Sequence, residues 1–148
     1  MMTVYFTAEA TTKGGREGHV KSNDGTIDLD LAMPKPNHVS NATNPEQLFA
    51  AGYSACYDSA LNLVAQRKRL KIESAVTGKV SLLKDESDNG YKIGVVLEVE
   101  IHGVSQEQAE ELTHAAHQIC PYSKATRGIL MYKSLQQQGK TKDAKINR

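Results

Sequence analysis

The sequence lacks tryptophan, and among its 148 residues it has only two phenylalanines and two cysteines. Neither sign of charge dominates: the formal net charge is +1, so the composition gives no bias toward nucleic acid or anionic membranes. No apolar run approaches the roughly 20 residues that cross a bilayer. Residues 1–10 also lack the basic region and apolar core of a secretory signal. These absences predict a cytoplasmic protein.

Because the chain has only two cysteines, Cys56 and Cys120, either they form a single reactive pair or neither is reactive. The cytoplasmic thiol pool keeps ordinary disulfides reduced, which favours a reactive pair over a permanent cross-link. The alternative is two inert thiols, because free cysteine is among the most buried residue types.

The residues that are present describe an ordinary globular chain, with 39% hydrophobic and 24% charged residues. The length suffices for one domain with its own core. We expect a single domain over residues 1–135, followed by a polar, solvated tail over residues 136–148.

Apolar periodicity and turn residues predict the element order βββ-α-ββ-α-α-β. Short turns such as Asn89-Gly90 favour antiparallel hairpins. The order indicates an α+β protein in which antiparallel sheets pack around a long central helix. The expected strands are 3–11, 18–22, 26–31, 73–84, 91–102 and 129–135, the expected helices are 43–69, 105–119 and 122–127, and residues 33–42 are an expected loop.

The long central helix begins with capping residues and places Cys56 on its apolar stripe. Thr43 fits a capping box with Glu46, and Asn44 fits an N-cap one residue later, with Pro45 as the first helical residue. Gly52 lowers helix propensity, which indicates close packing against a neighbour. The helix is apolar or small around much of its circumference, so we also expect a second subunit to cover it.

A cysteine nucleophile reacts as the thiolate and therefore needs a nearby positive group. Cys120 precedes a predicted short helix, whose first N–H groups can serve it. Cys56 lies in mid-helix, so its activator must come from elsewhere: Arg16 is preferred and Arg127 is the alternative, with Glu46 as the carboxylate that a buried arginine requires. Glu46 and Cys56 are separated by roughly 15 Å along one straight helix.

A metal site is a weaker alternative. His114, His117, Glu110 and Cys120 carry groups that bind transition metals, but their spacing matches no strong signature. We therefore expect neither a metal nor a cofactor.

Four motifs together resemble the organic hydroperoxide resistance (Ohr) proteins of the OsmC-like superfamily. The resemblance covers about residues 3–135. The motifs are T-N-P-E-Q-L-F-A-A-G-Y-S-A-C-Y at 43–57, G-G-R-E-G at 14–18, S-N-D-G at 22–25 and C-P-Y-S-K-A-T-R-G at 120–128.

The resemblance implies an OsmC-like fold, an intertwined homodimer with shared active sites, and a peroxidase that reduces alkyl and fatty-acid hydroperoxides to alcohols. It makes Cys56 the peroxidatic thiolate, Cys120 the resolving cysteine, and Arg16 and Glu46 the activating pair. It implies a dithiol reductant, such as a lipoylated protein. Two alternatives stay open: an OsmC-type peroxidase of broader range, and a redox-sensing or stress-binding protein without turnover.

The sequence departs from the family pattern in two places. The loop at 37–42 lacks the usual glycines, and Lys124 and Ile129 replace common asparagines. Both departures leave the four proposed catalytic residues intact, so we expect them to affect substrate or reductant preference.

Overall fold

The structure, a computed structural model, describes residues 2–127 and 133–134. The chain divides into two compact units, residues 1–48 and residues 49–148. The expected tail at 136–148, and the expected strand at 129–135 except for residues 133–134, lie outside the described residues.

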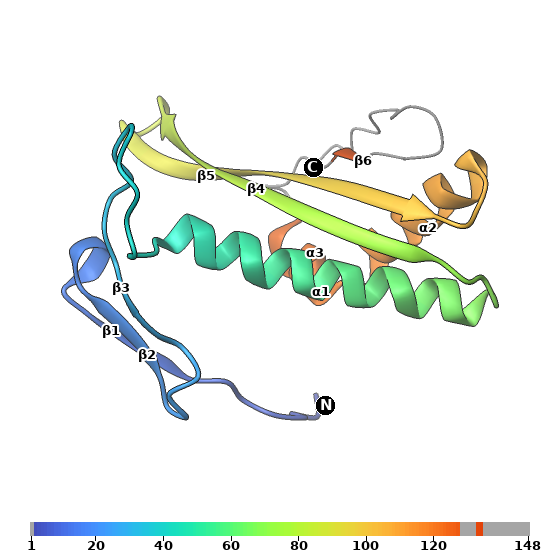
Figure 1. The fold of residues 1–148 in the computed structure, drawn as a ribbon, viewed down its shortest axis with the longest axis horizontal. Helices are drawn as coiled ribbons and strands as arrows, with labels where there is room; N and C mark the ends of the chain where they lie inside the picture. The colour runs from blue at the N-terminus through green and yellow to red at the C-terminus, as the bar shows by residue number, and fades with distance from the viewer. Residues whose placement is uncertain (1, 128–132, 135–148) are drawn as a thin grey trace. The chain divides into compact units, whose positions relative to one another are not determined.

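The first unit is the predicted three-stranded meander. Strands β1 (Ala10–Lys13), β2 (His19–Ser22) and β3 (Asp28–Asp30) form one antiparallel sheet in that order (Figure 1). A 3₁₀ turn, η1 (Gly15–Glu17), joins β1 to β2 and carries Arg16.

The first predicted strand was placed too early. The expectation was residues 3–11, whereas β1 covers Ala10–Lys13 and the segment before it is exposed and has no strand. The physical reason is the length of the partner strand: Ala10 pairs with Ser22, where β2 ends in a turn. Alternation of apolar residues cannot make a strand without a neighbouring backbone to bond.

A short backbone connection sets where the central helix begins. The Thr43 N–H donates to the Asp30 carbonyl at 2.8 Å, and the Ala32 N–H donates to the Thr43 carbonyl at 3.0 Å. The residues just before helix α1 (Pro45–Arg67) are thereby tied to the end of β3.

The second unit contains most of α1 and five further elements. Their bounds are β4 (Glu73–Asp85), β5 (Gly90–His102), α2 (Gln106–Ile119), α3 (Pro121–Thr126) and β6 (Lys133–Ser134). The sheet order is β4-β5-β6, with β4 and β5 antiparallel over their full length and β6 parallel to β5. The predicted order βββ-α-ββ-α-α-β is confirmed, and α1 ends two residues before the predicted Arg69.

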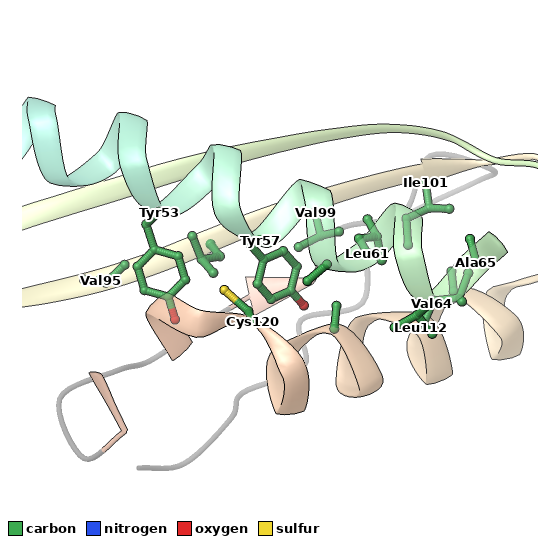
Figure 2. Packing of buried hydrophobic residues seen from close by; sticks show 14 residues of the cluster. Tyr53, Tyr57, Leu61, Val64, Ala65, Val95, Val99, Ile101, Leu112 and Cys120 are labelled. Carbon is green, nitrogen blue, oxygen red and sulfur yellow. The ribbon is translucent and has the colours of Figure 1, made fainter. Parts of the chain in front are cut away.

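The core of the second unit lies between α1, α2 and one face of β5 (Figure 2). Alternate β5 residues, Val95, Leu97, Val99 and Ile101, are buried, as the alternation in the sequence predicted. Tyr57 and Leu61 of α1 and Leu112 of α2 are fully buried against them. Each such large side chain contributes about 1.5–3 kcal/mol on burial, so this core holds the two long helices firmly.

Among the described helices, none is long and apolar enough to cross a membrane.

Candidate active site

The two cysteines, 64 residues apart in sequence, lie together in the second unit. Their Sγ atoms are 3.8 Å apart, and both are free thiols. Cys56 is partly buried on α1, whereas Cys120 is fully buried between α2 and α3 (Figure 2). A disulfide bond is about 2 Å long, so a two-electron oxidation could join the two thiols after only a small approach of the sulfurs.

Cys56 occupies the stripe of α1 that the sequence predicted, in a tightly packed region. A Cβ atom added at Gly52, one turn before Cys56, would collide with the hydroxyl of Tyr122. One at Gly78 of β4 would lie 3.0 Å from the carbonyl oxygen of Ala50 on α1. The two glycines therefore let neighbouring groups approach α1 closely, which confirms the interpretation of Gly52.

Cys120 is the junction between two helices. Its N–H donates to the Ala116 carbonyl at 2.8 Å and closes α2. Its Sγ accepts the Ser123 N–H at 3.5 Å and caps α3, which begins at Pro121. The residue before a proline avoids the helical region, so Cys120 is extended and turns its thiol toward α1.

The surroundings of Cys56 favour its protonated form. Burial raises the pKa of the Cys56 thiol, and the adjacent Cys120 raises it further. The backbone N–H of Tyr122, which hydrogen-bonds the sulfur, lowers this pKa but does not outweigh burial. A reactive thiolate at Cys56 thus requires an additional positive group.

Arg16 and Glu46 form a bidentate ion pair in the first unit. Arg16 Nη1 donates to Glu46 Oε2 at 2.9 Å, and Nη2 donates to Oε1 at 2.7 Å. The hydrogen bonds from Arg16 hold the pKa of Glu46 below its ordinary value, although burial opposes them. The same bonds raise the pKa of Arg16. Two parallel bonds fix the guanidinium plane, with its side chain still 40% exposed.

The helix start leaves Glu46 available for this pair. Asn44 Oδ1 accepts the Gln47 N–H at 2.8 Å, and α1 begins at Pro45. Of the two predicted capping arrangements, the structure has the one with Asn44. Thr43 instead donates its hydroxyl to Gln47 Oε1 at 2.7 Å.

Three aromatic rings gather beside the cysteines. The ring centroids of Phe49, Tyr53 and Tyr122 are 5.5–6.1 Å apart in pairs. Tyr53 has no exposed surface, so it is a core residue and not a surface for substrate, whereas Tyr122 is 37% exposed.

Ser123 was not predicted from the sequence, and His117 was predicted only as a possible metal ligand. Both are buried, and Ser123 Oγ hydrogen-bonds both His117 and Tyr53. Among residues 2–127 and 133–134, no group of three or more His, Cys, Asp or Glu side chains is arranged to hold a metal ion. The alternative activator, Arg127, donates to the Gln118 carbonyl at 2.9 Å.

Comparisons with known proteins agree with the resemblance that the four motifs indicated. A family model described as OsmC-like protein matches residues 37–130. The organic hydroperoxide resistance protein OhrA of Bacillus subtilis is 57% identical over 126 residues, which cover 83% of this chain and 89% of the relative. OhrB of the same organism is 54% identical over 124 residues, covering 83% of this chain and 91% of the relative.

Solved structures agree. The crystal structure of Bacillus subtilis OhrB matches with a TM-score of 0.83 and 50% identity, covering 90% of this chain and all of that one. An organic hydroperoxide resistance protein from Elizabethkingia anophelis matches with a TM-score of 0.82 and 45% identity, covering 91% of this chain and 98% of that one.

Proposed function

The chain belongs to the organic hydroperoxide resistance proteins of the OsmC-like family, and from this premise we propose that it is a thiol peroxidase that reduces organic hydroperoxides to alcohols. The single observation that supports this reaction best is the pair of free thiols, Cys56 and Cys120, with their sulfurs 3.8 Å apart. A lone nucleophilic cysteine would not need a second, fully buried thiol at that distance.

In the first step, the Cys56 thiolate attacks the distal oxygen of the hydroperoxide and the O–O bond breaks. The sulfur is oxidised to a sulfenic acid, and the alkoxide leaves and takes up a proton to become the alcohol. The positive group that this step requires is, in our proposal, the guanidinium of Arg16, oriented by Glu46. It would stabilise both the thiolate and the departing alkoxide.

In the second step, the Cys120 sulfur attacks the sulfenic sulfur of Cys56. An S–S bond forms, the S–O bond breaks, and the hydroxide leaves as water with the Cys120 proton. A dithiol such as a reduced lipoyl group then restores both thiols by two exchanges and is itself oxidised to a disulfide. A dithiol suits this reaction because its second thiol resolves the mixed disulfide within one molecule.

The preference for an organic peroxide rests on the apolar surroundings of Cys56. Phe49 is partly buried, Tyr122 is partly exposed, and their rings meet edge to face with centroids 6.1 Å apart. Met33 is 43% exposed in the first unit. We propose that these side chains favour an alkyl chain over the small, polar hydrogen peroxide.

Two further features belong to the proposal. The first is a homodimer with shared active sites, supported by the large apolar side chains of Val4, Tyr5 and Phe6, which are 75%, 94% and 84% exposed. The second is a cytoplasmic location, where a thiol pool maintains the reduced cysteines.

The test is a multiple-turnover assay with cumene hydroperoxide and excess dihydrolipoamide, in which cumyl alcohol is measured against enzyme concentration. The proposal expects many equivalents of alcohol per chain. Consumption of a single equivalent would favour a redox sensor without turnover. Equal rates with hydrogen peroxide and cumene hydroperoxide would favour the broader OsmC-type peroxidase.

A further inference from the structure

A buried serine at the start of α3 is hydrogen-bonded to two other helices. Ser123 Oγ lies 2.7 Å from the Tyr53 hydroxyl of α1 and 3.0 Å from His117 Nδ1 of α2. Ser123 and Tyr53 have no exposed surface, and His117 is 4% exposed. Because each of these polar atoms is shielded from water, losing one partner would leave another buried and unsatisfied.

The protons in this network can be assigned from the number that each group holds. Thr126 Oγ1 donates to the Tyr122 carbonyl at 2.6 Å and lies 3.4 Å from the Tyr53 hydroxyl, so the shorter bond takes its proton. An arrangement that satisfies the three groups has Tyr53 O–H donating to Ser123 Oγ and Ser123 O–H donating to His117 Nδ1. In this arrangement Nδ1 of His117 carries no proton and accepts the bond. Burial lowers the pKa of His117, with Arg127 and His114 acting in the same sense, which favours the neutral ring.

The same turn of α3 presents consecutive backbone donors to the two sulfurs. The Tyr122 N–H hydrogen-bonds the Cys56 sulfur, and the Ser123 N–H donates to Cys120 Sγ at 3.5 Å. Hydrogen bonds from backbone N–H groups stabilise a thiolate more than a thiol, provided that the donors stay in place. A six-residue helix offers little stability of its own, so its first turn needs an external attachment.

We propose that His117, acting through Ser123, is a positioning residue for the cysteine pair: it fixes the first turn of α3 so that its two N–H groups face Cys56 and Cys120. Tyr53 completes the attachment from α1. The role in turnover rests on the proposed peroxidase function, whereas the effect on the thiols themselves does not.

The test compares reduced wild type with Ser123→Ala, His117→Leu and His117→Asn. Asparagine can offer an uncharged oxygen acceptor near the place of Nδ1, whereas leucine cannot. Tyr57→Phe is the matched control, because Tyr57 is equally buried and joins α1 to α2 by donating to the Thr113 carbonyl at 2.6 Å. Two rates are measured: alkylation of Cys56 at neutral pH, and formation of the Cys56–Cys120 disulfide by oxidised glutathione.

Oxidised glutathione makes the test independent of peroxide. The Cys56 thiolate displaces one glutathione, and Cys120 then displaces the second, so two protein thiols are oxidised and one glutathione disulfide is reduced. A wild type that forms this disulfide but does not turn over hydroperoxide would refute the proposed function alone.

We expect Ser123→Ala and His117→Leu to slow both rates by about two- to tenfold, the effect of losing one hydrogen bond. His117→Asn should recover most of the loss, and Tyr57→Phe should change neither rate even where it lowers thermal stability. Rates in Ser123→Ala equal to those in Tyr57→Phe would overturn the proposal, as would equal impairment in His117→Leu and His117→Asn. If His117→Leu does not fold, the two rates in Ser123→Ala are compared with those in Tyr57→Phe, and this comparison alone tests the proposal.

Discussion

At the scale of single residues, the two cysteines differ in exposure, and this difference suits different roles. Cys56 is partly exposed, so a peroxide can reach its sulfur. Cys120 has no exposed surface, so its sulfur can react only with the oxidised sulfur of Cys56. The order of reaction that we propose for them is therefore supported by access as well as by the motif resemblance.

This order predicts distinct defects in two serine variants. Cys56→Ser should consume no hydroperoxide, because it has no accessible thiolate. Cys120→Ser should consume one equivalent at a rate close to that of wild type and then stop at the sulfenic acid. Stopped-flow mixing with cumene hydroperoxide, with the reductant added afterwards, separates the steps. Equal loss of the first equivalent in both variants would refute the assignment of roles.

Arg16 should determine the pKa of the nucleophile. Burial raises the pKa of Cys56, so removing the proposed positive group in Arg16→Ala should raise it further and shift alkylation to higher pH. Arg127→Ala is the matched control, since Arg127 is the other candidate and contacts the end of α2. An alkylation profile that moves in Arg127→Ala and not in Arg16→Ala would reassign the activator.

The Arg16–Glu46 pair also predicts a pH dependence of stability. The pKa of Glu46 is lower in the folded state than in the unfolded state, chiefly because of the bonds from Arg16. Its stabilising contribution is therefore complete above the unfolded pKa and is lost as the pH falls through the folded value. In urea unfolding, Glu46→Gln should be less stable than wild type at neutral pH, and the difference should shrink on acidification. A difference that grows on acidification would contradict this coupling.

Sequence patterns predicted the candidate site residues and the pairing of Arg16 with Glu46, but not the hydrogen bonds around Ser123. The motifs placed Cys56, Cys120, Arg16 and Glu46, and the structure forms the 3.8 Å sulfur contact and the bidentate pair. Ser123 was missed because a serine in a short helix has no periodic signal. Only the fold reveals that its hydroxyl lies between α1 and α2.

At the scale of elements, boundaries followed from local chemistry wherever a turn or a cap set them. Ser105 caps α2 with a complete capping box to Gln108, and Asn89 has the positive φ of a hairpin turn. The first strand could not be placed from the sequence because its length depends on where β2 ends. The choice between Thr43 and Asn44 likewise depended on a competing partner, as Thr43 bonds Gln47 and Glu46 bonds Arg16.

Helix α1 and α3 meet closely at Gly52, which yields a prediction about packing. Alanine at this position gains about 1 kcal/mol of helix propensity, yet its Cβ would collide with the Tyr122 hydroxyl. Gly52→Ala should therefore be destabilising, and less so in the Tyr122→Phe background, where the colliding atom is absent. A double-mutant cycle by urea unfolding measures this coupling.

Ala55→Gly serves as the control for this cycle. Ala55 is exposed on the same helix, so glycine there should lower the free energy of unfolding by about 1 kcal/mol in both backgrounds. Equal effects of Gly52→Ala in both backgrounds would show that the hydroxyl is not what requires glycine.

At the scale of the whole molecule, exposed apolar residues support the proposed homodimer. Val4, Tyr5 and Phe6 are exposed, as are Ile27 and Leu29 of the first unit. Light scattering should therefore give about twice the 16.2 kDa mass of one chain. Replacing the N-terminal set in Val4→Ser/Phe6→Ser should shift the mass toward one chain, whereas Tyr91→Ser, at an exposed hairpin site, should not. A wild-type mass of one chain would contradict the dimer.

The fold class could be predicted at this scale because alternation in β5, helical periodicity and turn residues all agreed. The sequence did not reveal that the chain forms two compact units or that β6 runs parallel to β5. Both features depend on contacts between distant segments, which local patterns do not contain.

Peptide mapping after oxidation tests the central account most directly. Fully reduced protein is mixed with one equivalent of cumene hydroperoxide without reductant, quenched by alkylation, and digested under non-reducing conditions. The account predicts one equivalent of cumyl alcohol and a single cross-linked peptide pair joining Cys56 to Cys120. Peroxide consumption that leaves Cys120 alkylated as a free thiol would contradict it.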